Sequence, residues 1–322
     1  MDESWDRRRF LKRVAAGCAG VAGTTAAGLL LSDDGRDQPP GSPEVSQVRD
    51  FSDGLRTGDA ALVVAGGAPE AATRAAIRSL GGMKSFIKAK DVVAIKPNIG
   101  WDRTPVQAAN TNPLVVRSLV ELCYDAGAAR VIVTDNTCNE AKRCFTRSGI
   151  WKAAEQAGAE VILPAPHRFR NYHMGGVVLG EMPVLTSAVQ ADRFINAPIA
   201  KHHGLSGFTG AMKNLYGILG GRRNRLHQRI DDSIADLADF VRPTLTVMDA
   251  TRVLMRNGPQ GGNLDDTREV GKIIASTDQV AVDAYSCGLI GLEPGDLPYL
   301  RMAQERGLGN ADLAKITVRE VG

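Results

Sequence analysis

A basic, glycine-rich segment at residues 201–228 contains the side chains best suited to chemistry. His203 can serve as a general base or as a metal ligand. Lys213 can bind an anion or, once removed from water, act as a base or nucleophile. We expect a functional site here, in preference to a glycine-rich connection that a histidine caps. The same segment supplies three candidate ligand-binding residues, Lys201, Gly210 and Asn214.

Three arginines follow within the same segment, at Arg222, Arg223 and Arg225, with His227 beside them. Guanidinium groups bind carboxylates and phosphates through paired hydrogen bonds, so these arginines are candidate ligand-binding residues. His227 is a candidate metal ligand together with His203. A solvated basic loop explains the individual arginines equally well. A nucleic-acid site is less well supported, because no aromatic side chains accompany the charge to stack on bases.

Further polar residues stand at the ends of apolar runs. Lys96 and Asn98 end one such run, and Asp135 ends the next. Ligand sites in open α/β sheets form just beyond the carboxyl ends of the strands. We therefore expect these three residues to bind a ligand in the same crevice as Lys213. Asp249, Asp278 and Asp283 follow the same logic, although helix capping explains Asp278 and Asp283 at least as well.

The elements that must position these residues alternate along the chain. Continuous runs rich in Val and Ile predict strands buried on both faces, and amphipathic runs between them predict helices. We predict an α/β fold of mainly parallel sheets flanked by helices, with the site at strand carboxyl ends near the Gly/His/Lys-rich crossover. The predicted strands are 61–65, 92–96, 130–134, 160–163, 193–196, 245–249, 272–275 and 315–318. The predicted helices are 70–80, 113–126, 149–157, 230–241, 280–289 and 297–305.

The N-terminal residues are typical of a twin-arginine export signal. Arg7-Arg8-Arg9-Phe10-Leu11-Lys12 precedes an uncharged, weakly apolar run at 14–31. This run has the length of a signal h-region and is too weakly apolar for a stable membrane span. We expect a periplasmic or other extracytoplasmic location, with the twin-arginine translocase as a partner. No small-x-small cleavage site precedes Ser32, so an uncleaved anchor is the alternative and would be the chain's membrane attachment.

These features divide the chain into a signal at 1–35, a linker at 36–55 and an α/β domain at 56–322. The domain is long enough for two lobes, which we place at 56–200 and 201–322. The formal charge is +3, and five Arg and Lys residues lie within the signal at 7–13. The remaining surface is therefore close to neutral and gives no general attraction to nucleic acid or to an anionic membrane.

The cysteines limit the cofactors that the chain can hold. Cys-x-x-Cys does not occur, so neither an iron–sulfur cluster nor a zinc ribbon is expected. Cys138 and Cys144 flank a short loop, and in an oxidising compartment they can form a disulfide; two free thiols are the alternative. Cys123 and Cys287 lie in apolar helical patterns and are expected to pack in the core.

Ordered motifs from residue 91 to residue 322 resemble those of the domain-of-unknown-function family numbered 362. Its Lys-x-His falls on Lys201 and His203, its Lys-Asn on Lys213 and Asn214, and its later histidine on His227. Many relatives carry a ferredoxin-like insert with cysteine clusters. This chain lacks the insert, so the resemblance does not imply direct electron transfer. The other matching motifs are Val93–Asn98, Thr111–Pro113, Ala126–Ala128, Gly258–Gly262 and Asp278–Asp283; Ala250 stands where relatives often have glycine.

A second, local resemblance is to lactate racemase. That family has His-x-x-x-Gly-aromatic-Ser/Thr-Gly-x-x-Lys, and His203 to Lys213 repeats this spacing. In that family the lysine tethers a nickel pincer cofactor and histidines serve as base and ligand. At the spacing of the family's later histidine this chain has Arg229, and His227 lies two residues earlier. The resemblance therefore implies a shared α/β scaffold and leaves nickel open.

Two hypotheses of function follow. The first is an exported enzyme that acts on a small carboxylate or phosphate by His/Lys proton transfer, racemase- or isomerase-like, with or without a divalent metal. The second is an accessory protein that holds a metal or cofactor for an extracytoplasmic redox system. A scaffold without chemistry is a third reading, weakened by the many Lys, His and Arg side chains at strand ends.

Overall fold

The computed structural model describes residues 48–52 and 61–322, and these belong to one compact unit. The predicted signal at 1–35 and most of the linker at 36–55 lie outside the described residues. None of the helices in the described part of the chain combines the length and the apolar character needed to cross a membrane.

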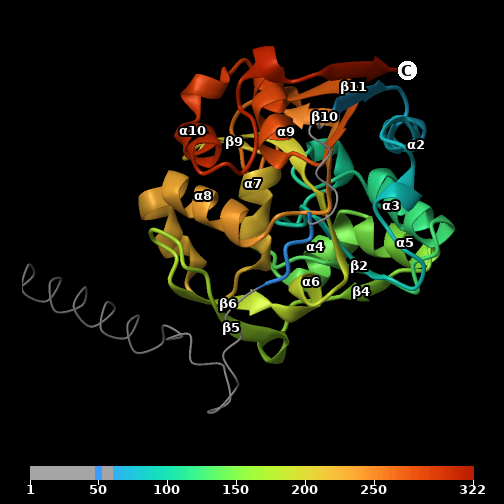
Figure 1. The fold of residues 1–322 in the computed structure, drawn as a ribbon, viewed down its shortest axis with the longest axis horizontal. Helices are drawn as coiled ribbons and strands as arrows, with labels where there is room; N and C mark the ends of the chain where they lie inside the picture. The colour runs from blue at the N-terminus through green and yellow to red at the C-terminus, as the bar shows by residue number, and fades with distance from the viewer. Residues whose placement is uncertain (1–47, 53–60) are drawn as a thin grey trace, which may run out of the picture. The chain divides into compact units, whose positions relative to one another are not determined.

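A large, mostly parallel sheet forms the centre of the fold (Figure 1). Its main path runs β12-β1-β11-β10-β7-β2-β3-β4, and the short strands β8 and β9 extend it beside β10. Pairing is parallel along β10-β7-β2-β3-β4, so the carboxyl ends of these strands share one edge. β11 is antiparallel to both of its neighbours. The strands are β1 Leu62–Gly66, β2 Val92–Pro97, β3 Arg130–Thr134, β4 Glu160–Ile162, β7 Arg193–Ala197, β8 Ile199–His203, β9 Gly207–Thr209, β10 Leu245–Leu254, β11 Thr267–Ser276 and β12 Val318–Val321.

Helices cover both faces of this sheet (Figure 1). Alternate residues of β1 enter two separate cores: Leu62 and Val64 join one, and Val63 and Ala65 join the other. This alternation is why the strands read as continuous apolar runs. The first core is closed by α6 Thr186–Val189, α7 Ala211–Asn214, α8 Ile230–Phe240, α9 Gln279–Ser286 and α10 Pro298–Glu305. The second is closed by α2 Pro69–Ser79, α3 Pro113–Asp125, α4 Ala141–Arg147 and α5 Ile150–Gln156.

Local sequence signals set the ends of α3. The side chain of Asn112 accepts a hydrogen bond from the N–H of Leu114, and Pro113 occupies the first helical position. Gly127 follows the helix with a φ of +102°, a conformation that glycine adopts without steric cost. α3 therefore begins and ends where the sequence predicts.

The predicted lobes 56–200 and 201–322 do not build separate sheets. β10 and β11 come from the second range, yet they lie between β1 and β7 of the first. Parallel pairing of β10 with β7 through Leu245 and Ile195 joins the two ranges in one sheet. The structure thus has the predicted α/β, mainly parallel architecture, with the two ranges interleaved.

The segment at 201–228 is more regular than its glycine content suggests. β8 and β9 form a hairpin, and α7, η4 (Leu215–Ile218) and η5 (Arg223–Arg229) follow in close succession. Gly207 opens β9 with a φ of +70°, which explains one of the glycines. A separate hairpin of β5 (Phe169–His173) and β6 (Glu181–Leu185) was also not predicted from the sequence.

Candidate functional site

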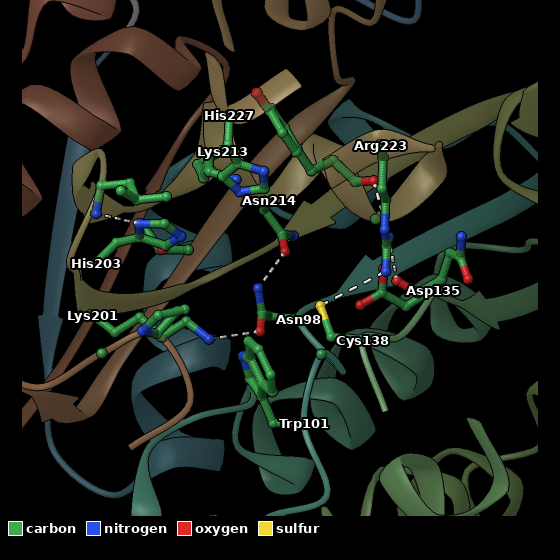
Figure 2. A pocket seen from close by; sticks show the side chains of 18 of the residues that line it. Asn98, Trp101, Asp135, Cys138, Lys201, His203, Lys213, Asn214, Arg223 and His227 are labelled. Atoms are coloured by element: carbon green, nitrogen blue, oxygen red, sulfur yellow. Dashed lines mark hydrogen bonds between the residues drawn. The ribbon is translucent and has the colours of Figure 1, made fainter. Parts of the chain in front are cut away.

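A cavity of about 450 Å³ lies at the carboxyl ends of β2, β3 and β8, and residues of η4 and η5 also line it. Figure 2 shows side chains that line this cavity. Its volume suits a small organic molecule. Trp101, Leu205, Tyr216 and Pro259 give it apolar surface. Nine of the predicted site residues line it: Lys96, Asn98, Asp135, Lys201, His203, Lys213, Asn214, Arg223 and His227.

A buried ion pair forms one wall. The Nζ atom of Lys96 lies 2.8 Å from Oδ1 of Asp135, and both side chains are almost completely inaccessible to water. Burial lowers the pKa of Lys96 and raises that of Asp135, and their mutual attraction opposes both shifts. Lys96 also donates to the carbonyl of Pro97 and to Asn214, so three oxygen atoms surround its Nζ atom. This lysine is fixed as an ammonium group.

Close approach of this pair to η4 depends on Gly217. A Cβ atom at that position would lie 1.9 Å from Oδ1 of Asp135 and 2.6 Å from Nζ of Lys96. Either distance is far below van der Waals contact, so glycine is required here for steric reasons.

A chain of amide hydrogen bonds connects this wall to the opposite one (Figure 2). Oδ1 of Asn214 accepts from Lys96 and from the Nδ2 group of Asn98. Nδ2 of Asn214 donates to the carbonyl of Lys96 and to Asn196, which fixes the orientation of its amide. Asn98 must therefore turn its Oδ1 atom toward Lys201, and it accepts from Nζ at 3.1 Å.

Within the part of the chain that the structure describes, neither Lys201 nor Lys213 has a carboxylate partner. Nζ of Lys201 donates to Asn98 and, at 2.6 Å, to the carbonyl of Ala109. Nζ of Lys213 lies 3.4 Å from the centroid of the Tyr216 ring, and the described residues give it no hydrogen-bond acceptor. Burial is the main cause that lowers the pKa of each lysine to about 7. Near neutral pH both therefore exist partly as uncharged amines.

His203 is held by the hairpin turn that follows it. Its Nδ1 atom accepts from the backbone N–H groups of Leu205 and Ser206, at 3.1 and 3.2 Å. A nitrogen that accepts two N–H groups carries no proton, so the proton of the neutral ring lies on Nε2. Burial, reinforced by the positive charge of Lys213, lowers the pKa of His203 to about 3. The ring therefore presents a hydrogen-bond donor, and Figure 2 shows this edge turned away from the hairpin.

His227 stacks on His203, with ring centroids 6.2 Å apart and planes 10° from parallel. Burial, with Lys213 adding to it, lowers the pKa of His227. Its Nδ1 atom lies 3.1 Å from the carbonyl of Asn224. Metal-bound imidazoles direct in-plane lone pairs at one ion from about 2 Å. In the neutral ring of His203, however, Nε2 carries the proton and has no lone pair to offer a metal ion.

The expected pairing of His203 and His227 around one metal ion therefore does not fit this arrangement. Within residues 48–52 and 61–322, moreover, no group of three His, Cys, Asp or Glu side chains is placed to hold a metal.

Arg223 closes the cavity near β3. Its guanidinium donates to the backbone carbonyls of Asn136, Thr137 and Tyr216. It also lies 3.7 Å from Sγ of Cys138, an interaction drawn in Figure 2. These partners hold the arginine in place without neutralising its charge.

Cys138 and Cys144 are both free thiols in the structure. Of the two alternatives, the structure therefore has the free thiols and not the disulfide. Cys144 is buried, and its Sγ atom lies 3.9 Å from the carbonyl of Gly100. Cys123 and Cys287 are buried in the cores, as expected.

Asp283 supports the helix that carries Lys213. Its buried carboxylate accepts from the N–H groups of Ala211 and Met212, the first residues of α7. A Cβ atom at Gly210 would lie 2.1 Å from Oδ1 of Asp283, so this glycine makes room for the carboxylate. Burial raises the pKa of Asp283 to about 7. Gly210 thus positions the site without lining the cavity.

The remaining predicted residues lie elsewhere. Arg222 and Arg225 are exposed on the surface and do not line the cavity. Asp278 caps α9, and Asp249 accepts from Asn112 and Thr251 at the base of a different depression. Cavity residues that the sequence reasoning did not select include Trp101, Cys138 and Tyr216. Trp101 and Cys138 each follow a predicted strand by a few residues, which is the signal that could have identified them.

Comparisons with known proteins show what this chain is similar to. The chain is 26% identical over 255 residues to a thylakoid-associated protein of Synechocystis sp., an alignment that covers 77% of each chain. A solved structure from Thermotoga maritima aligns with 70% of this chain and 60% of its own, at 12% identity and a TM-score of 0.41. The lactate racemase apoprotein of Thermoanaerobacterium thermosaccharolyticum aligns with 71% of this chain and 56% of its own, at 11% identity and a TM-score of 0.44. The chain thus spans less than two thirds of either solved structure.

The family comparison covers the whole candidate site. The family model described as domain of unknown function (DUF362) matches residues 93–288, more than half of the chain. This range begins in β2, just before Lys96, and ends after α9. The chain therefore belongs to the DUF362 family.

Proposed function

We propose that this protein is an enzyme that acts on a small anionic molecule, a carboxylate or phosphate, by proton transfer inside the cavity. One observation carries the proposal: three lysines and Arg223 line the cavity, against the single carboxylate of Asp135. Positive charges that are concentrated in a cavity and partly removed from water are costly unless a bound anion compensates them. A ligand with an anionic group and an apolar part matches this lining.

The environment of each side chain suggests its role. Lys201 is the base in this proposal, because two hydrogen bonds orient its amine and leave the third position of the nitrogen without a protein partner. Lys213 binds and activates the substrate. His203 donates from Nε2 to an oxygen that gains negative charge as the proton leaves the neighbouring carbon. This assignment moves the role of base from His203 to Lys201.

Hydrogen exchange tests the proposal directly. The purified protein is incubated in D₂O with small carboxylates that carry a C–H bond next to the carboxylate, and deuterium incorporation is followed by mass spectrometry. We expect Lys201→Met to lose about 10²–10⁴-fold in exchange rate, the usual contribution of a general base. Lys84→Met, at an exposed position on the surface, is the matched control and is expected to retain the rate. Equal rates in wild type and Lys201→Met would contradict the assignment.

We further propose that the protein acts outside the cytoplasm, after export by the twin-arginine translocase. The support is the order of Arg7-Arg8, Phe10-Leu11 and the weakly apolar run at 14–31. Export of a folded chain would deliver the buried lysines and histidines already arranged.

A further inference from the structure

The lysines that line the cavity lie in distinct environments. Lys96 is held as an ammonium by Asp135, Asn214 and the carbonyl of Pro97. Lys201 has two acceptors, Asn98 and the carbonyl of Ala109. Lys213 is 7% exposed and has no hydrogen-bond acceptor among the described residues. In a buried amine without acceptors, the charged form is destabilised most, so its pKa falls. The neutral amine has a lone pair that is available to attack a substrate.

Positive charges on neighbouring elements add to this effect. The groups that face Lys213 are Lys201 and His203 on β8, Arg223 and His227 on η5, Tyr216 on η4 and Cys138 after β3. Arg223 and Lys201 disfavour its ammonium form, and a thiolate at Cys138 would favour it. The Tyr216 ring, whose centroid lies 3.4 Å from Nζ, favours the ammonium form and opposes part of the effect of burial. The net surroundings therefore favour the free amine, whose lone pair is a nucleophile.

We infer that Lys213 forms a Schiff base with its substrate, and that the substrate is a small carboxylate bearing a carbonyl group, such as a 2-oxo acid. This inference rests on the proposed function and names how Lys213 activates the substrate. Arg223 offers positive charge to the carboxylate of the substrate. His203 offers the Nε2 proton to the carbonyl oxygen.

The covalent step balances without another reactant. The lone pair of Nζ attacks the carbonyl carbon, and the resulting alcohol is lost as water after its oxygen gains a second proton. The two protons of the amine are released in the same process, so the sum is amine plus carbonyl giving imine plus water. The imine withdraws electrons from the adjacent C–H bond, which makes that proton easier for Lys201 to remove.

Reductive trapping tests this inference. Wild-type protein is mixed with pyruvate and sodium borohydride, digested, and mapped by mass spectrometry. Borohydride delivers hydride to the imine carbon and makes the attachment permanent. We expect one adduct per chain, on Lys213, with a yield that rises with pH through about 7, where the pKa of Lys213 lies. Ordinary surface lysines need a pH near 10 for the same reaction.

Variants and a second ligand distinguish failure of the Schiff-base inference from failure of the proposed anion site. Lys213→Met and Lys213→Arg are expected to lose at least tenfold in adduct, and the surface variant Lys84→Met to match wild type. Lactate, which has the charge and carbon skeleton of pyruvate but no carbonyl, is expected to bind and to reduce the yield. An adduct on Lys201 or spread over surface lysines would overturn the inference. If lactate binds and no adduct forms, the Schiff base is wrong and the anion site stands; if neither ligand binds, both are wrong.

Discussion

Two hydrogen bonds decide what His203 can do. Because Nδ1 accepts from the N–H groups of Leu205 and Ser206, the ring can donate from Nε2 but cannot accept there while it stays neutral. Its pKa of about 3 keeps it neutral throughout the physiological range. A neutral imidazole that donates to a developing oxyanion is a known catalytic arrangement.

Replacing His203 by asparagine distinguishes two roles of this side chain: donating a hydrogen bond from Nε2 and stabilising the turn through Nδ1. An asparagine oxygen can take the place of Nδ1 in capping Leu205 and Ser206, whereas alanine cannot. We expect both His203→Asn and His203→Ala to lose about 10²–10³-fold in hydrogen exchange, as when one oxyanion donor is removed. Only His203→Ala is expected to lose a further 1–2 kcal/mol or so of stability in urea unfolding. Retained exchange in His203→Asn would show that the ring is purely structural.

At this scale the sequence predicts which residues meet, and not what each one does. Lys96, Asp135, Lys201 and Lys213 were selected because they follow strands, and parallel strands bring their carboxyl ends together. The role of His203 depends on the turn that follows it, in which the backbone N–H groups of Leu205 and Ser206 donate to Nδ1. Residue types alone do not predict this backbone geometry. Arg222 and Arg223 are adjacent and alike, yet only Arg223 enters the cavity.

At the scale of elements, the position of η4 against β2 and β3 depends on one glycine. A methyl group at Gly217 would displace Asp135 and Lys96, which are buried and cannot move into water. Disrupting a buried ion pair typically costs 3–5 kcal/mol or so. We therefore expect Gly217→Ala to lose stability on this order and to weaken anion binding.

Gly180→Ala is the matched control for this prediction. Gly180 is exposed, and a Cβ atom there would meet no atom within 4 Å. We expect its unfolding free energy to stay within about 0.5 kcal/mol of wild type. Urea unfolding of both variants makes the comparison, and equal stabilities would refute the steric account of Gly217.

The sequence predicts well those strands that are covered by helices on both faces of the sheet. β1, β2, β3, β4 and β7 fall within a residue or so of their predicted ranges, because an apolar run of that length fits a buried strand. β10 and β11 extend further than predicted, into residues that alternate in character. β8 and its hairpin partner β9 are not predicted, because β8 contains polar residues, Lys201 and His203, whose burial depends on the site itself.

For the whole molecule, the interleaving of the two predicted lobes follows from strand order, which local patterns do not contain. β11 enters between β1 and β10 as an antiparallel strand, and its composition alone does not specify its neighbours. The chain therefore closes a single sheet only when its last third is in place. The cavity likewise draws its lining from both ranges.

Export itself is testable at this scale. We expect replacement of Arg7 and Arg8 by lysine to keep the full-length protein in the cytoplasm, because the translocase reads the arginine pair and not the charge alone. Cell fractionation with an antibody to the protein measures the distribution. Unchanged extracytoplasmic recovery of the double variant would contradict this route and leave the cavity chemistry unaffected.

Anion binding coupled to proton uptake tests the central claim most directly. With a pKa of about 7, Lys201 and Lys213 are largely neutral at pH 8. A bound anion favours their ammonium forms and raises both pKa values, so binding draws protons from the buffer, up to about two per anion. At pH 6 the lysines are already mostly protonated, and uptake is expected to be small.

Isothermal titration calorimetry with lactate and with inorganic phosphate, in buffers of different ionisation enthalpy, measures this uptake. We expect binding by the wild-type protein, with a buffer-dependent enthalpy at pH 8 that nearly disappears at pH 6. The double variant Lys201→Met and Lys213→Met is expected to lose both the uptake and most of the affinity. Wild-type binding without proton uptake at pH 8, or equal binding by the double variant, would contradict the assignment of this cavity as an anion site.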